Sequence, residues 1–537
     1  MDRRETGILI TTGGVLAAGC FSLFHFVFPY HLFFKEQIQL FLLTADYFIS
    51  YFENPAWLAA YLGDFLTQFF YLRGGGATVL SIVLLIEWCL IIQILRAFGL
   101  MDRRFLQTTL LSFIPILIAC YLHTGLSYPL SMSVSVILVL TISLIYTRID
   151  TKWGALAYGV ITLPALYTMA GVAFFLFPVL IICYEISQKK IQLLYWLLLV
   201  AIAGFFPFMM KRVYLLTTKQ AYLYPLKTLK VSHINLNNEK ALALASESYF
   251  ENRKKVYELT DEYNLSNTLA TYYTNIALSE QGELPDRLLN YYQPFSEGLF
   301  LQVGPESNWV DIFFSSDVFF HLGDMNMAQH LAMLGMIFSP NRRSSRMVKR
   351  LAEINIVNND SAAARKYLRM LDATLFHRKW ALAHEKMLTG NVDDYPWLKA
   401  KRLQIPTRDT LRLPSDYPAS LNILIESNPG NSYALDYLLC FYLLNKDIRS
   451  FGETYDRWHK GKVRPSTLYD EALLIKLSTT KAMQKERAAY AISPELIKDF
   501  AEYTRIYEQS GADLKQLRER FGKTYWFYYH FAQMEKQ

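Results

Sequence analysis

Long apolar runs fill residues 7–212 and are almost absent from residues 213–537. A helix that crosses a bilayer needs about 20 consecutive, mostly apolar residues. The runs that meet this length are 7–29, 75–97, 104–122, 127–147 and 191–210. The contrast predicts an all-α protein, in which a polytopic membrane bundle at 1–212 precedes a water-soluble helical tail.

The stretch 153–186 is also apolar, but Pro164 and Gly171 interrupt it. It is long enough for two short, tilted spans or for a re-entrant pair. Counted as a pair, it brings the bundle to about seven membrane segments.

Positive charges distinguish the two sides of this bundle. Alternate loops are rich in lysine and arginine, and the loops between them hold few. The rich loops carry Arg3, Arg4, Arg96, Arg103, Arg104, Arg148, Lys152, Lys189 and Lys190. Since cytoplasmic loops hold the excess of positive charge, the N-terminus is predicted inside and the tail outside the cytoplasm. Only Lys211 and Arg212 mildly oppose this orientation.

The amino-acid composition limits the classes of partner that the sequence predicts. The formal net charge is +7 over 537 residues, so neither half is basic enough to indicate nucleic acid. The aromatic run 525–531 is therefore interpreted as a docking or capping surface rather than a platform for bases. Cys440 is the one cysteine of the tail, so no disulfide can form within it. The lipid bilayer is the first predicted partner.

The first external loop has a helical polar stripe. At 100° per residue one narrow arc gathers most of its polar side chains, and the rest of the cylinder is apolar. The arc holds Glu36, Gln39, Asp46, Ser50, Glu53 and Asn54. Asn54 suits a helix N-cap, with Pro55 at the first helical position. Two interfacial helices are predicted in 31–72, broken at Asn54–Pro55.

The acidic residues of this loop have two interpretations. One is the solvated face of an interfacial helix. The other is a catalytic site above the membrane, in which a partly desolvated Glu36 acts as general base. Asp46 and Asp64 are the next candidates, and such carboxylates could hold a divalent metal.

Glu87 lies in the middle of the run 75–97. An ionisable group at that depth is costly and marks a functional hypothesis. His25 could reach it from the first span. The alternative is a protonated glutamate bonded to a neighbouring helix.

The tail has a helical rhythm. Small turns at Gly282, Gly323 and Asn359 each precede a new helical pattern, and tetratricopeptide (TPR) helical pairs repeat at about 34 residues. We predict a TPR-like first block at 213–395, a proline-rich connection at 396–430 and a second block at 431–537. An irregular helical bundle is the alternative. Stacked pairs would form a curved surface for a protein partner.

Three passages resemble a family of bacterial polytopic membrane proteins with helical-repeat tails, which carries no activity with it. They are PAWLAAYLGDFLTQFFY (55–71), YYTNIALSEQGELPDRLLNYYQ (272–293) and FFHLGDMNMAQHLAM (319–333). The resemblance implies the bacterial cytoplasmic membrane, with a periplasmic tail.

The overall plan is also similar to the GT-C membrane glycosyltransferases, which use an acidic residue soon after the first span and a polyprenyl-phosphate sugar donor. Glu36 stands where that residue would be, but KEQ (35–37) has one carboxylate where the family usually has a pair. This likeness implies a transferase with Glu36 as the base.

Three functions follow from these patterns. They are a GT-C-like transferase, a membrane-anchored scaffold that binds a protein partner, and a transporter centred on Glu87. The number of spans favours the transferase slightly. Glu36→Gln separates it from the scaffold, with Glu353 expected to serve as a surface control.

Overall fold

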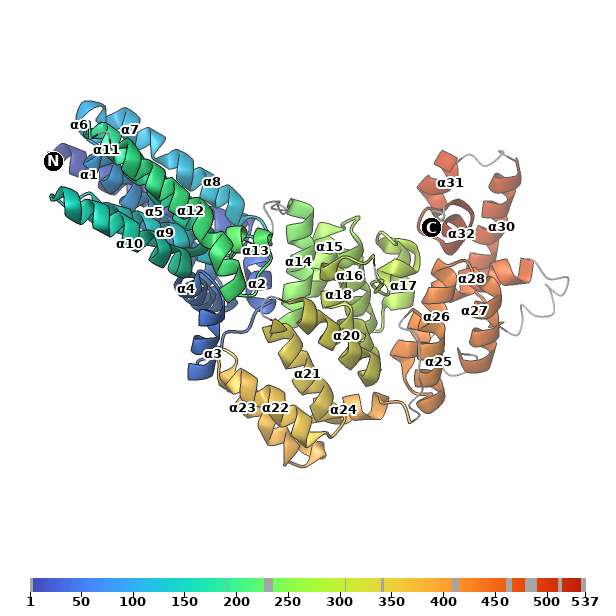
Figure 1. Ribbon diagram of the computed structural model, residues 1–537. Coiled ribbons are helices and arrows are strands. Elements are labelled where there is room, and N and C mark those ends of the chain that lie inside the picture. The colour runs from blue at the N-terminus through green and yellow to red at the C-terminus, as the bar shows by residue number, and fades with distance from the viewer. Residues whose placement is uncertain are drawn as a thin grey trace. The chain divides into compact units, whose positions relative to one another are not determined.

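The computed structural model describes residues 3–190, 192–226, 235–304, 306–339, 342–407, 415–459, 466–478, 490–509 and 514–532. The helices and strands assigned within these ranges are all helices, which confirms the all-α prediction (Figure 1). The chain forms two compact units. Unit 1 is Met1–Glu239 with Arg343–Ser345 and Arg369–Ala381, and unit 2 is Lys240–Arg342, Arg346–Leu368 and Leu382–Gln537.

Unit 1 contains the apolar bundle. Within the described residues, five helical stretches are long and apolar enough to cross a membrane, and a shorter apolar helix, α9 (Ser131–Tyr146), packs among them. The five are Arg3–Val27, Gly75–Ala97 (α5), Phe105–His123, Lys152–Ser187 and Leu193–Val213 (α12). Such helices are typical of a polytopic membrane protein.

The stretch Lys152–Ser187 folds back on itself. It consists of α10 (Lys152–Ala170), a short 3₁₀ turn and α11 (Leu176–Ser187). Gly171 at the turn has φ +59°, and a Cβ there would lie 2.3 Å from the carbonyl oxygen of Tyr224. Only glycine fits both restrictions. The helices α10 and α11 therefore form a pair, as the interrupted apolar pattern predicts.

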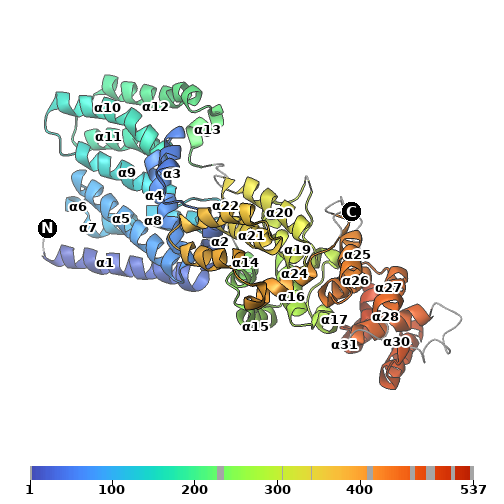
Figure 2. The same ribbon diagram turned by 90° about the horizontal axis from the view of Figure 1, so that it is seen from below.

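Hydrogen bonds identify the helix ends that lie together at one end of the bundle. Gln188 after α11 donates to Ala97 at the end of α5, and the Tyr184 hydroxyl donates to Thr147 at the end of α9. Trp196 near the start of α12 donates to Glu185 of α11. These ends adjoin the loops with the predicted cytoplasmic charges. In both views α5 lies beside α9, and α10 lies beside α12 (Figures 1 and 2).

The first external loop differs from its prediction. It forms three short helices, α2 (Tyr30–Gln37), α3 (Ala45–Ser50) and α4 (Trp57–Thr67), where two were expected. The predicted break near Asn54 is present, but α4 begins at Trp57, and Ala56 with φ 59° takes the N-cap position assigned to Asn54.

The additional break follows α2 because the backbone there bonds to distant segments of unit 1. The Leu43 N–H donates to Ala373 (2.7 Å), and the Ser345 N–H donates to Gln39 (3.0 Å). Since Gln39 and Leu43 belong to the same loop, two tail segments hold it. Tertiary contacts thus override the local helical pattern.

Unit 2 consists of helices joined by tight turns. Gly282, Gly323 and Asn359 all have positive φ, at the turns that the sequence predicts. The last two join full pairs of helices, whereas α17 after Gly282 is only four residues long. The helices are α14 (Leu236–Tyr249, mostly in this unit), α15 (Arg253–Tyr263), α16 (Thr268–Glu280), α17 (Leu284–Arg287), α18 (Trp309–Phe314), α19 (Ser316–Leu322), α20 (Met325–Phe338), α21 (Ser345–Val357) and α22 (Ser361–Asp372, partly in unit 1).

The remaining helices include two in the proline-rich segment. Pro396 and Pro418 stand in the first turns of α24 and α25, where the missing N–H costs nothing. The helices are α23 (Arg378–Glu385, partly in unit 1), α24 (Pro396–Gln404), α25 (Tyr417–Ser427), α26 (Ser432–Leu444), α27 (Ile448–Thr454), α28 (Thr467–Ser478), α30 (Pro494–Gln509), α31 (Leu514–Phe521) and α32 (Tyr525–Phe531). Tyr525 and Trp526 of α32 are buried and donate to Glu471 of α28.

Candidate functional site

Glu36 lies in the last turn of α2 and is 5% exposed. Its Oε1 is 2.9 Å from Nε2 of His377, a residue of the segment 369–381 within unit 1. The His377 ring packs edge-on against Tyr71, with 4.9 Å between centroids. Glu36 is therefore a buried partner of His377, which excludes for this residue the solvated face that was one of the two interpretations of the polar arc.

Asp46 and Asp64 occupy different surroundings. Asp46 is exposed in the first turn of α3. Asp64 on α4 is partly buried and accepts a 2.7 Å hydrogen bond from the Tyr51 hydroxyl. Burial and the Asp64 charge raise the pKa of Tyr51, so this phenol stays protonated. No group of three or more histidine, cysteine, aspartate or glutamate side chains able to hold a metal occurs within the described part of the chain.

Glu87 and His25 lie within apolar helices. Glu87 on α5 is 4% exposed and hydrogen-bonds to Ser133 of α9. His25 is partly exposed and stacks on Phe21 at 5.0 Å. The Ser133 hydroxyl also lies 2.8 Å from Nε2 of His123. Glu87 thus has a polar neighbour in Ser133, and in the part of the chain that the structure describes it forms no hydrogen bond or ion pair with His25.

A buried polar cluster at the start of α2 was missed by sequence reasoning. Glu239 accepts hydrogen bonds from the backbone N–H groups of Tyr30 and His31, where the helix dipole favours an anion. Nζ of Lys35 donates to the carbonyl oxygen of His123 at 2.9 Å. Burial lowers the pKa of Lys35 to about 7, against the opposing effect of Glu239. His31 and Lys35 are four residues apart, so their shared face was visible in the sequence.

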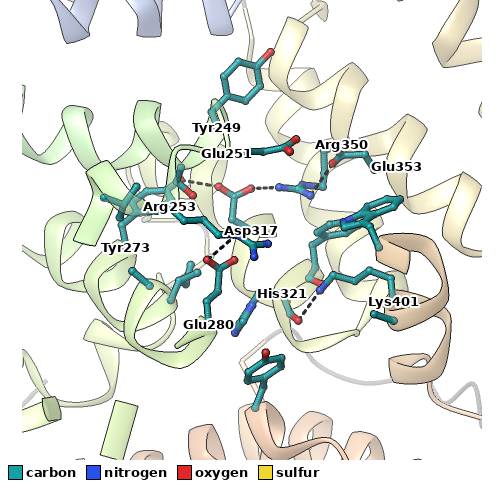
Figure 3. A pocket seen from close by; sticks show the side chains of 18 of the residues that line it. Tyr249, Glu251, Arg253, Tyr273, Glu280, Asp317, His321, Arg350, Glu353 and Lys401 are labelled. Atoms are coloured by element: carbon teal, nitrogen blue, oxygen red, sulfur yellow. Dashed lines mark hydrogen bonds and ion pairs between the residues drawn. The ribbon is translucent and has the colours of Figure 1, made fainter. Parts of the chain in front are cut away.

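Unit 2 contains a polar cavity of about 580 Å³. Its lining comes from α14, α15, α16, α19, α21, α24 and α26, and Figure 3 shows the labelled side chains converging on it. Both charged and aromatic side chains line it. The charged residues are Glu251, Arg253, Glu280, Asp317, Arg346, Lys349, Arg350, Glu353 and Lys401.

Asp317 on α19 organises one wall of this cavity. Its Oδ2 accepts from the Tyr273 hydroxyl at 2.7 Å and from Arg346, and its Oδ1 accepts from Arg350 at 3.1 Å. Burial works to raise the pKa of Asp317, but Arg346 and Arg350 bring it below its usual value. The carboxylate is therefore charged and joins α16, α19 and α21.

Lys401 on α24 lies across the cavity. Its ammonium donates to the carbonyl oxygens of Phe320 (3.0 Å) and His321 (2.8 Å) and to the Gln404 side chain (3.1 Å). Both carbonyl groups belong to the last turn of α19, and the helix dipole makes a cation favourable at that end. Burial, and then Arg350, lower the pKa of Lys401 to about 7.

Glu353 corrects an expectation about the surface. It is 7% exposed and accepts a 2.7 Å hydrogen bond from Arg350 inside the cavity. It cannot serve as a surface control, whereas Glu385 on α23 is exposed. The spacing Arg346, Arg350, Glu353 places all three on one face of α21, a signal that the sequence offered.

Replacing Asp317 with asparagine should strongly destabilise the protein, because Arg346 would keep its buried charge without an anion. Breaking a buried pair costs about 3–5 kcal/mol. The stabilisation is present above the unfolded aspartate pKa of about 4 and is lost as pH falls through the lowered folded value. Thermal unfolding of the full-length protein in detergent measures it. Asp393→Asn, which breaks the exposed pair with Lys399, should leave the unfolding midpoint nearly unchanged, because exposed ion pairs contribute little to stability. Equal midpoints for both variants would contradict this assignment.

Comparison with known proteins identifies the family of this chain. A family of unknown function, DUF6057, matches residues 6–532. No curated protein and no solved structure matches the chain. Because the family match runs through both units, the chain belongs to the DUF6057 family.

Proposed function

We propose that this protein is a membrane-anchored binding protein, in which the bundle holds the helical domain at the membrane surface and the cavity receives part of a protein partner. The cavity around Asp317 is the observation that carries the proposal. Ligand sites are concave, of about 300–1,000 Å³, and combine apolar or aromatic walls with a few placed polar groups. The cavity has a volume of about 580 Å³ and aromatic groups in Tyr249, Trp397 and Tyr433, and its wall is richer in charged side chains than that of a typical ligand site.

The proposal places the helical domain outside the cytoplasm, in the periplasm of a bacterial cell. The helix ends near Ala97, Thr147 and Ser187 lie together and adjoin the loops with most of the bundle's positive charge. By the positive-inside rule that end faces the cytoplasm. The chain leaves the bundle after α12 at the other end.

A reporter that fluoresces only in the cytoplasm, fused after the last residue, should stay dark in bacterial cells. The same reporter placed in the loop between α11 and α12 should fluoresce, because that loop carries Lys189 and Lys190. Bright fluorescence from the C-terminal fusion would reverse the orientation.

Filling the cavity should abolish function without unfolding the domain. Ala400 lines the cavity and is exposed, so Ala400→Trp places an indole in the binding space without a core clash. The matched control is Ala362→Trp on α22, which is exposed and outside the lining. In cells that need the protein, only Ala400→Trp should fail to complement a deletion, with both variants present at equal levels. Full complementation by Ala400→Trp would refute the proposal.

A GT-C-like transferase is the second candidate. One observation favours it: Oε2 of Glu36 has no hydrogen-bond partner among the described residues, while Oε1 faces His377. A carboxylate held in this way by an imidazole could take a proton from an acceptor hydroxyl. The donor would be a polyprenyl-phosphate sugar at the outer membrane surface.

Glu36→Gln distinguishes the candidates. An amide oxygen still accepts from His377, so the fold should persist, but the base is lost. A transferase would lose roughly 10²–10⁴ in rate. A binding protein should complement normally, as should the exposed control Glu385→Gln. Loss of complementation by Glu36→Gln, with normal protein levels and unfolding midpoint, would favour the transferase.

A further inference from the structure

The charges of the cavity do not cancel. Each of its four carboxylates lies within 4 Å of a cation of the same cavity: Glu251 with Lys349, Glu280 with Arg253, Asp317 with Arg346 and Arg350, and Glu353 with Arg350. Lys401 has no carboxylate at that distance among the described residues; its three donors face neutral oxygens. The lining therefore has one positive charge without an acidic partner.

That charge lies beside a second cation on one aromatic ring. The Arg350 guanidinium is 3.9 Å from the centroid of Phe320, and the Lys401 ammonium is 5.1 Å from it. Arg350 contributes to the lowered pKa of Lys401, so the two charges repel each other. Nε of Arg350 is buried without a hydrogen-bond partner among the described residues. An anion near both groups would relieve the repulsion and satisfy this donor.

The aromatic side chains of the lining could pack against an apolar group that lies next to this anion in a ligand. Trp397 lies 6.3 Å from the Phe320 ring, and Tyr433 lies 4.8 Å from the ring of His321. At the mouth, Arg253 and Glu251 are 72% and 74% exposed, so a ligand can enter from water. The volume of about 580 Å³ falls within the usual range of ligand sites.

We infer that the cavity recognises a carboxylate of the partner polypeptide, next to an apolar or aromatic side chain, with Lys401 and Arg350 as the anion-binding groups. This inference rests on the proposed binding function and names the chemistry that the cavity selects. A carboxylate carries one negative charge, which matches the single unpaired cation. A phosphate monoester carries about 1.5 to 2 charges at neutral pH and would overcompensate it.

Binding should depend on pH through Lys401. The groups around it are Arg350 and Glu353 on α21, Glu280 on α16, Arg253 on α15 and His321 on α19. A bound carboxylate favours the charged ammonium, so affinity should fall as pH rises above the free-state pKa of about 7. Each pH unit costs up to about tenfold in affinity. The peptide carboxylate itself stays ionised, since its own pKa is about 3.5.

The test uses the full-length protein in detergent and measures peptide affinity by calorimetry at pH 6 and 8.5. The probes are acetyl-Ala-Ala-Phe with a free carboxylate, the same peptide as an amide, and the amide peptide acetyl-Ala-Glu-Phe. Phenyl phosphate tests the other anion. The free acid should bind, more tightly at pH 6, and acetyl-Ala-Ala-Phe amide should not. Binding of acetyl-Ala-Glu-Phe amide as well would identify an acidic side chain as the carboxylate source.

Lys401→Met should weaken binding of the acid about 10- to 100-fold and remove the pH dependence. The control Lys399→Met, on the same helix but exposed, should bind as the unmodified protein does. If Lys401→Met fails to fold, the pH dependence of the unmodified protein still decides. Equal binding of acid and amide, no binding of either carboxylate, or preference for phenyl phosphate would overturn the inference. If Ala400→Trp still abolished complementation, the binding function itself would stand.

Discussion

The charged centre at Asp317 is the interaction on which the helical domain most depends. A buried carboxylate is tolerated only when cations and hydrogen bonds replace its water, and here Tyr273, Arg346 and Arg350 do so from α16 and α21. Arg346 also donates to the carbonyl oxygen of Ala245 on α14. One aspartate thus fixes the relative register of four helices. The same pairing places charged and polar groups in the cavity wall, which an apolar core would not.

Buried polar groups are also paired with one another where α2 follows the first apolar helix of unit 1. The first N–H groups of α2 would lack partners in an apolar setting, and Glu239 supplies the acceptor. His31 and Lys35 reach the carbonyl oxygen of His123, at the end of another apolar helix. Within unit 1, polar side chains thus satisfy helix ends that lipid could not satisfy. This role explains why His31, Lys35 and Glu239 are buried there.

The apolar helices could be predicted from the sequence because hydropathy depends on the local composition alone. The fold-back at Gly171 could also be predicted, because glycine marks a backbone conformation that other residues cannot adopt. The partners of Glu36 and Lys401 could not be predicted. His377 is 341 residues from Glu36, and nothing in the polar arc indicates that a distant segment covers it. The residues of the arc do not share one face, because α2 ends at Gln37 and α3 begins at Ala45; Glu36 is buried, whereas Asp46 and Glu53 are exposed. Arg346, Arg350 and Glu353 had a readable spacing, yet their meaning required Asp317 from another helix.

The ion pairs among the charged side chains of the cavity limit which ligands it could bind. Most cations of the cavity already form ion pairs with carboxylates of the same cavity. A ligand anion therefore meets few unpaired positive charges. The buried pair between Arg346 and Asp317 would have to break before Arg346 could bind a ligand, and the stranded carboxylate would cost more than the new contact gains. Arg350 differs, because its Nε has no hydrogen-bond partner among the described residues and can donate while its two ion pairs persist. Affinity must therefore come from the aromatic walls, and charge must act chiefly as a filter. A dianion or a cation leaves a net buried charge, whereas a single carboxylate near Lys401 and Arg350 leaves none. Under the proposed binding function, the arrangement favours modest affinity with strict discrimination.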